Sequence, residues 1–204
     1  HPNSSILMKR FILLTLSLII ANLAFAQNPA AQVDNIKFKN LSDDWVEMEV
    51  KIRANRNLTE GAKNERFVDN IKVLGYFAYV RDRKARTFDF YKAEVEVISI
   101  EQGKTEHVYF YMPGIVVKRD RLPKEPPYYF VALEINGQVL PIDSRAYSKS
   151  TLNDDTIRSM KTKADAESEP NDFILMPHYN APLGLIGARP SKLAPLLRRD
   201  AKKQ

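Results

Sequence analysis

The sequence predicts an all-β fold in which two antiparallel sheets pack as a sandwich. Between residues 32 and 142, about seven segments carry apolar residues with a strand period, and turn residues separate them at short intervals. The same range holds no long segment with the 3.6-residue period of a helix. Short strands with closely spaced turns are typical of sandwiches and barrels. Hydrophobic residues at 44%, with aromatic residues at 10%, suffice for one core.

The N-terminal segment has the pattern of a secretory signal peptide. Residues 1–7 precede Met8 and are interpreted as upstream sequence or a cloning remnant. Within residues 8–26, two basic residues precede an uncharged apolar run, and Ala24-Phe25-Ala26 offers the small residues that signal peptidase requires. We expect cleavage before Gln27 and export to the periplasm, the outer membrane or the cell surface. A membrane anchor is the alternative, but the 16 residues from Phe11 to Ala26 fall short of the ~20 that span a bilayer.

The body is expected to span residues 27–143 and begins with strands marked by alternation. Residues 33–38 form a short strand, and residues 40–44 form the turn that follows it. Residues 45–54 have a period of two, and from Val46 to Ala54 apolar and charged side chains alternate strictly, which indicates a half-buried antiparallel strand. Residues 67–80 are apolar on both faces, as in a central strand, and residues 88–100 form another long strand.

The second half of the body predicts three more strands. Residues 105–117 return from a glycine turn, and Pro113-Gly114 bends or ends this strand. Residues 128–135 and 138–142 flank Asn136-Gly137, a pair that readily takes the positive φ angles of a type I′ turn. We therefore expect an immunoglobulin-like β-sandwich of about seven strands. An eight-stranded barrel is the rival, and one sequence does not reveal the strand order.

The composition changes after residue 143. Residues 144–172 read as a polar linker with a short helix that Asn153 or Asp154 caps. The apolar positions of this helix would be Leu152, Ile157, Met160 and Ala164. Residues 173–187 are predicted to dock, because the run from Phe173 to Met176 is apolar and would add an edge strand. Residues 188–204 are predicted to form a mobile basic tail.

The charge of the chain lies mainly at its C-terminal end. The formal net charge is +6, and removal of Lys9 and Arg10 with the leader leaves +4. Residues 173–204 hold six basic residues and one acidic residue, so that segment is +5 and residues 27–172 sum to −1. A nucleic-acid-binding domain would carry its basic excess on a folded face. We therefore predict no nucleic-acid partner.

Residues that carry chemistry are scarce. The absence of cysteine excludes disulfides, zinc–thiolate sites and a cysteine nucleophile. His107 and His178 are the two histidines that follow the leader, and no nucleotide-binding or hydrolase motif is present. Glu47 and Glu49 share a strand face that Lys51 continues, so we interpret them as part of a solvated face. The sequence predicts no enzyme, no catalytic residue, no metal and no cofactor.

Two basic turns and a set of outer-face tyrosines are the candidate partner sites. The turns could bind an acidic partner, a sulfated glycan or an anionic surface. Charged residues at turns and strand edges also prevent aggregation, which explains them without a partner. The tyrosines could form a stacking platform, although cross-strand packing explains them as well. The predicted site residues are Arg81, Arg83, Lys84, Arg86, Lys118, Arg119, Arg121, Tyr109 and Tyr111.

Three stretches resemble a known group of secreted proteins. They are DWVEMEV at residues 44–50, RFVDNIKV at residues 66–73 and PHYNAPLG at residues 177–184. From about Gln32 to Leu183 the chain is similar to a small secreted protein of Verrucomicrobia, whose gene accompanies a type IV pilus-like cluster in a mucin-degrading gut bacterium. The resemblance implies an immunoglobulin-like sandwich, an envelope location and a link to pilus formation. This chain lacks the long apolar N-terminal helix of pilins, so the resemblance implies an accessory protein.

These observations predict a non-enzymatic exported protein that binds other proteins in a pilus-like assembly or at the cell surface. Its expected partners are envelope or pilus-like proteins, with glycans or anionic surfaces as further candidates. The alternative function is a carbohydrate-binding module that uses exposed tyrosines and the basic turns.

Overall fold

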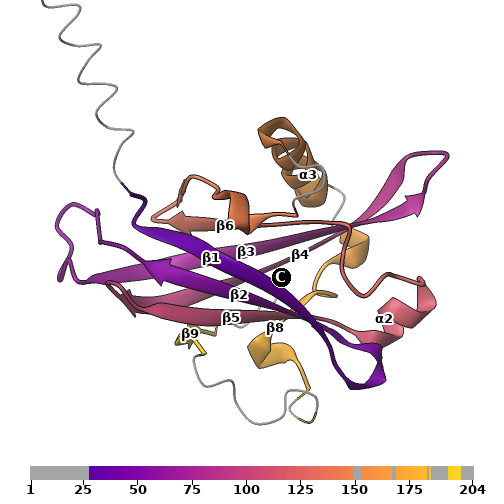
Figure 1. Cartoon of the computed structure of the whole chain (residues 1–204), viewed down its shortest axis with the longest axis horizontal. Helices are drawn as coiled ribbons and strands as arrows, with labels where there is room; N and C mark the ends of the chain where they lie inside the picture. The colour runs from indigo at the N-terminus through magenta and orange to yellow at the C-terminus, as the bar shows by residue number, and fades with distance from the viewer. Residues whose placement is uncertain (1–27, 149–152, 167–168, 183, 185–192, 199–204) are drawn as a thin grey trace, which may run out of the picture.

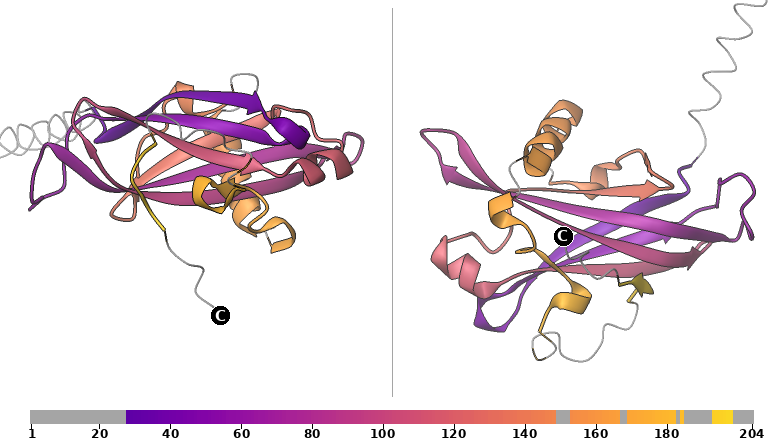
Figure 2. Two further views of the ribbon diagram at one scale, coloured as in Figure 1. Left: turned by 90° about the horizontal axis from the view of Figure 1, so that it is seen from below. Right: turned by 180° about the vertical axis from the view of Figure 1, so that it is seen from behind.

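The computed structural model describes residues 28–148, 153–166, 169–182, 184 and 193–198. They form two stacked antiparallel sheets, which Figure 2 shows edge-on as two layers. The first sheet has the order β1 (Ala31–Asn40), β2 (Val46–Ala54), β5 (Thr105–Met112) and β8 (Met176–Pro177). The second has the order β7 (Gln138–Val139), β6 (Tyr128–Ile135), β3 (Phe67–Asp82), β4 (Thr87–Glu101) and β9 (Leu196–Leu197). The predicted all-β sandwich is confirmed (Figure 1).

The helices are short and lie outside the two sheets. The α-helices are α2 (Gly114–Arg119) and α3 (Asp154–Ala166). The single-turn 3-10 helices are η2 (Ser42–Asp44), η3 (Ser144–Ala146), η4 (Glu169–Asn171) and η5 (His178–Asn180). No helix in the described ranges is long and apolar enough to cross a membrane.

The sequence pattern located most strands and one turn closely. The side chains of β2 alternate between buried positions and positions that are half-buried or, at Arg53, exposed, and β2 pairs with both β1 and β5. Asn136 and Gly137 both have positive φ, 51° and 78°, and join β6 to β7 as predicted. The strand expected over residues 105–117 ends at Met112, because Pro113 precedes α2 and residues 114–117 are helical.

The main core lies between the two sheets. Its largest fully buried side chains include Phe77 and Tyr79 of β3 and Phe110 of β5. Gly75 sits opposite this packing, since a Cβ there would lie 3.1 Å from Met48 Cε and 3.3 Å from Phe110 Cε2. The first sheet therefore presses its side chains against bare backbone of the second.

Helix α3 covers the outer face of the second sheet. Ile157, Met160 and Ala164, three positions of the predicted stripe, are buried against an aromatic surface. In that surface the rings of Tyr76 and Phe130 stack with centroids 4.4 Å apart. The side chain of Asn153 accepts a hydrogen bond from the Thr156 N–H at 2.8 Å, which confirms the predicted cap. Leu152 lies outside the described residues.

The described part of residues 173–198 forms what we call the C-terminal strap, namely residues 173–182 and 193–198. Leu175 is 1% exposed and β8 pairs with the edge of β5, so the segment docks as an edge strand. Phe173, however, is 79% exposed, and the prediction that it would be buried is wrong. Its φ of 64° turns the chain just before the buried Leu175.

The predicted mobile tail is also wrong where the structure describes it. Ala194 is 2% exposed, and β9 pairs with β4 of the second sheet. Backbone pairing and a small buried side chain thus anchor residues 193–198, although the sequence there shows no long apolar run. Residues 185–192 and 199–204 lie outside the described part of the chain.

Candidate partner-binding site at the basic end

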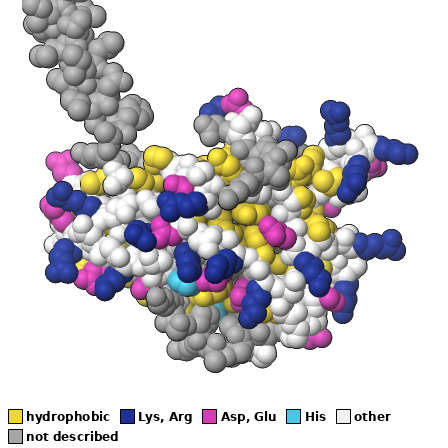
Figure 3. Space-filling view, in the orientation of Figure 1, with side chains coloured by type: hydrophobic (Ala, Val, Ile, Leu, Met, Phe, Trp, Pro, Cys, Tyr) yellow, Lys and Arg dark blue, Asp and Glu magenta, His cyan; other side chains and the backbone are white. Residues whose placement is uncertain are grey.

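The fold brings the two predicted basic turns to the same end of the sandwich. The first turn is the tip of the β3–β4 hairpin, and the second begins in α2 (Figure 1). In the space-filling view, Lys and Arg side chains project from this end (Figure 3). We call this region the basic end. It contains Arg81, Arg83, Lys84, Arg86, Lys118, Arg119, Arg121 and Lys124.

Local backbone hydrogen bonding shapes the hairpin tip. The Asp82 side chain accepts hydrogen bonds from the backbone N–H groups of Lys84 and Ala85 at 2.7 and 3.0 Å. Aspartate favours such turns because its carboxylate replaces a backbone acceptor. At the base of the hairpin Arg81 pairs with Asp89. The tip therefore has a defined turn from which the basic side chains project.

Close packing against the turn before β2 fixes the position of α2. The helix starts at Gly114, where a Cβ would overlap the carbonyl oxygen of Asp43 in η2. An ion pair of 3.1 Å between Lys118 and Asp44 adds to this contact. Arg119 makes a two-pronged contact with its neighbour Asp120, with both N–O distances at 2.7 Å.

The two turns interact electrostatically across the buried ring of Tyr91. Burial first, then the charges of Asp89 and Asp120, raise the pKa of Tyr91 to about 12. The hydrogen bond from Arg119 lowers the pKa of Asp120, and the charge of Arg81 lowers it further. The base of the hairpin and the end of α2 therefore lie within electrostatic range of each other.

Several cations at this end have no carboxylate partner. Arg81, Lys118 and Arg119 are paired with acidic residues. Five others make no ion pair within the described residues. They are Arg83, Lys84, Arg86, Arg121 and Lys124, and all five are exposed. Such a cluster attracts acidic ligands over roughly a Debye length, about 8 Å at physiological salt.

The predicted tyrosine platform is not exposed. Tyr109 and Tyr111 do lie on the outer face of the first sheet, but they are only 6% and 0% exposed. Ala181 and Leu193 of the C-terminal strap pack over them. Strand period reveals which face a side chain occupies, but it does not reveal that a segment from the far end of the chain covers that face.

Both described histidines contribute to a polar cluster at the same place. His107 Nδ1 lies 2.5 Å from Glu49 Oε1 and 3.2 Å from the Tyr109 hydroxyl. His178 Nδ1 lies 3.3 Å from the Tyr111 hydroxyl. Burial, followed by the charge of Glu47, raises the pKa of Tyr111 well above its ordinary value.

Sequence reasoning missed this cluster, because it interpreted Glu47 and Glu49 as part of a solvated face and did not connect them with His107. The pairing of β2 with β5 sets Glu49 directly opposite Tyr109 and Glu47 directly opposite Tyr111. A pairing of residues 45–54 with residues 105–112 would have revealed it. The polar groups contact one another, and Tyr111 contacts His178 of the strap. We therefore interpret the cluster as structural: it helps to hold the strap against the first sheet. Among the described residues, no group of three or more His, Cys, Asp or Glu could hold a metal.

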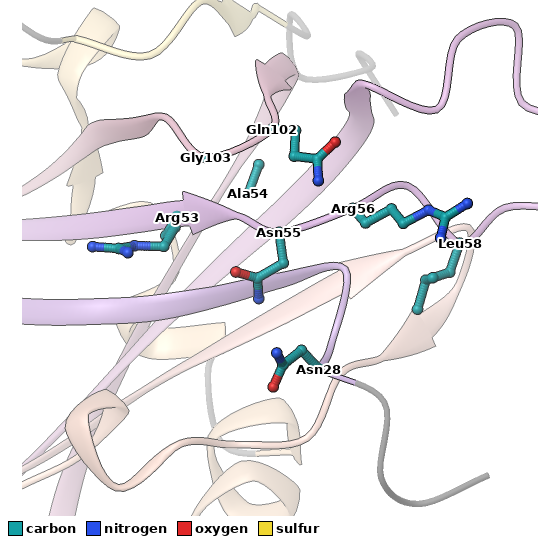
Figure 4. A pocket seen from close by; sticks show the side chains of 8 residues that line it. All are labelled: Asn28, Arg53, Ala54, Asn55, Arg56, Leu58, Gln102 and Gly103. Atoms are coloured by element: carbon teal, nitrogen blue, oxygen red, sulfur yellow. The ribbon is translucent and has the colours of Figure 1, made fainter.

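An open pocket lies at the opposite end of the sandwich. Its volume is 520 Å³, and Figure 4 shows the eight residues that line it. Arg53 and Arg56 point in opposite directions there, and each is paired with a carboxylate, Asp34 and Glu65 respectively. Because its polar groups do not converge on one point, the pocket does not define a ligand.

These features define a class of protein: a two-layer antiparallel β-sandwich with a charged end and a C-terminal strap. One protein-family model matches residues 16–180, well over half of the chain, and the chain belongs to that family. A crystal structure of a protein from Akkermansia muciniphila matches with a TM-score of 0.57 and 13% sequence identity. The match covers 85% of this chain and 95% of that chain, and it shows a shared fold. No curated protein matches the chain.

The organism of the matching structure agrees with the sequence resemblance. Akkermansia muciniphila belongs to the Verrucomicrobia, the group to which the three quoted stretches pointed. The fold is therefore shared with a protein of that group, while the pilus link stays a prediction.

Proposed function

We propose that this protein is a non-enzymatic accessory protein of the cell envelope, which binds an acidic partner protein through its basic end. The observation that carries the proposal is the gathering of five unpaired, exposed cations from two separate turns. The residues between 27 and 172 sum to −1. A local concentration of positive charge on a body without net positive charge favours one directed contact over general adhesion.

Export is part of the proposal. The basic residues at 9 and 10, the short apolar run and the Ala-x-Ala site support it. The total absence of cysteine is compatible with an oxidising compartment, because no thiol is present to mispair. A role in a type IV pilus-like assembly follows from the sequence resemblance and is proposed on that basis.

We also propose that the sandwich is immunoglobulin-like. In such folds the strands A, B and E share one sheet, and C′, C, F and G share the other. Here β1, β2 and β5 are neighbours in one sheet, and β4, β3, β6 and β7 are neighbours in the other. The chain order of the strands supports this assignment. The basic end carries the β3–β4 and β5–β6 connections, which in this assignment lie at the end of the sandwich opposite the antigen-binding loops of antibody variable domains.

The carbohydrate-binding alternative is weakened by the burial of its aromatic platform. Sugar rings stack on exposed aromatic faces, and Tyr109 and Tyr111 offer none. Tyr76, a third outer-face tyrosine, is 1% exposed beneath α3. A sulfated glycan on the basic turns alone is the form of the alternative that the test below can detect.

The test is charge reversal with a matched control. The variant Arg83→Glu/Lys84→Glu/Arg86→Glu changes the charge of the basic end by six units. The variant Lys63→Glu/Lys104→Glu/Lys163→Glu makes the same change at exposed, unpaired residues elsewhere. Each protein is immobilised and incubated with a native envelope extract, and bound proteins are identified by mass spectrometry.

We expect an acidic envelope protein on the wild type and on the control, and at least tenfold less on the basic-end variant. Binding should weaken as salt rises from about 50 to 300 mM, because the Debye length falls below ~8 Å. Equal loss in both variants would contradict a site at the basic end. Capture of sulfated glycan by the wild type, with no protein, would favour the alternative.

A further inference from the structure

The last described segment of the chain ties the two sheets together. Leu193 forms a bridge with His107 of β5, and the Ala194 N–H donates to the His107 carbonyl oxygen at 2.9 Å. One residue later, the Pro195 carbonyl accepts the N–H of Ile98 in β4 at 2.8 Å. Leu196 and Leu197 then pair with Val97 and Glu96 of β4. Five consecutive residues thus contact the edges of β5 and β4 on one side of the sandwich.

Backbone hydrogen bonds hold this segment together with apolar contacts of two partly buried side chains, Leu193 and Leu196. Ala194 is the side chain of the segment that is deeply buried, at 2% exposed, whereas Leu197 is 38% exposed and Pro195 is exposed. Strand addition of this kind takes its affinity from main-chain hydrogen bonds. The same bonds form equally well when the segment belongs to another copy of the chain.

The segment supplies hydrogen-bond partners to the strand edges of β4 and β5. Without residues 193–198, the N–H of Ile98 and the carbonyl of His107 lose their partners. Unpaired strand edges are templates for another strand. The structure shows that residues 193–198 fit these two edges. A second copy of the chain carries the same segment and can therefore fill the same place.

We propose that residues 193–198 exchange between copies of this chain, so that the segment of one copy completes both sheets of its neighbour. Eight residues separate Gly184 from Leu193, and the nine residue-to-residue steps allow a reach of roughly 30 Å when fully extended. Gly184 follows β8 and η5, which dock on the same side of the sandwich. Exchange therefore places the β4–β5 sides of two copies opposite each other.

Concentration governs the exchange. A segment tethered by a short linker has an effective concentration of the order of millimolar at its own site. In dilute solution the chain therefore closes on itself, and exchange grows as copies are brought together, as in an assembly on a surface. Exchange of an identical element is an established low-cost route to dimers.

The absence of cysteine allows a clean test with single-cysteine variants of the chain from Gln27 to Gln204. Glu96 and Leu197 face each other across the β4–β9 pair. Glu96→Cys and Leu197→Cys are therefore prepared as two separate proteins, one of them tagged. They are mixed at equal amounts, at about 10 µM and at ~1 mM, and oxidised. A disulfide between the two different variants forms only when one copy supplies β9 to the other.

We expect the mixed disulfide dimer at the higher concentration to exceed both same-variant dimers together, which random collision does not produce. Leu74→Cys mixed with Glu94→Cys is the matched control, since these residues pair within the body through β3 and β4. The control pair should give no such excess. Absence of an excess for Glu96 and Leu197 at ~1 mM, or an equal excess in the control, would overturn the proposal.

Discussion

The contact between α2 and η2 makes Gly114→Ala a sharp test of how the basic end is built. A Cβ at position 114 overlaps the Asp43 carbonyl oxygen and lies 2.9 Å from the Asp43 carbonyl carbon. Both groups are backbone, so no side-chain rotation relieves the overlap. Either α2 or the turn at Asp43 and Asp44, whose φ angles of 54° and 61° are already left-handed, must move.

Forced overpacking costs about 1–3 kcal/mol, and a backbone overlap belongs at the upper end of that range. Movement also separates Lys118 from Asp44, but this exposed pair adds little. For a chain of this length each kcal/mol lowers the melting temperature by ~2–4 °C, so we expect a fall of about 6–12 °C. Urea unfolding followed by circular dichroism should report a loss of roughly 3 kcal/mol.

Gly184→Ala is the matched control, because a Cβ there meets nothing within 4 Å. Its stability should stay within about 0.5 kcal/mol of the wild type. A Gly114→Ala protein as stable as this control would refute the packing argument, and with it the view that α2 is held rigidly beside η2.

Three further predictions concern titration and the elements that cover the sheets. Burial raises the pKa of Tyr76 and of Tyr109 to about 12, whereas the unfolded chain releases these protons near the ordinary value of 10.0. Stability should therefore be full below pH 10 and fall as the pH rises from 10 to 12, and an ultraviolet titration showing all nine tyrosines ionising near pH 10 without unfolding would contradict this. Met160→Ala, on the buried face of α3, should cost about 2 kcal/mol in urea unfolding, while Lys163→Ala on the exposed face should be neutral. In the strap, Leu175→Ala should destabilise by roughly 2 kcal/mol and Phe173→Ala by less than about 0.5, and equal effects would mean that burial at the two positions does not differ in solution.

The sequence predicted best those features that depend on neighbouring residues. The alternation of residues 45–54 reports a strand with one buried face, and Asn136-Gly137 fixes a turn by local backbone preference. Asn153 similarly caps α3 through a bond three residues away. In each case the physical cause lies within a few residues of the pattern, so a single sequence contains it.

Features that depend on distant segments could not be predicted. The alternation of Tyr109 and Tyr111 correctly placed them on the outer face, yet Leu193, more than eighty residues later, decides that this face is covered. The docking of residues 193–198 depends on backbone bonds to His107 and Ile98, and backbone bonds leave no mark in the side-chain pattern. The candidate site could be predicted only in part. The sequence shows the two basic turns, but only the fold shows that they lie at the same end of the sandwich.

The C-terminal strap also gives the molecule an internal optical probe. The protein has a single tryptophan, Trp45, and it packs in the cluster formed by Tyr109, Tyr111, Ala181 and Leu193. Indole emission shifts to longer wavelength when water reaches the ring. Departure of the strap removes Ala181 and Leu193 from this cluster and leaves the rest of the surroundings of Trp45 in place. Intrinsic fluorescence of the unmodified chain therefore reports strap release in real time, without any label.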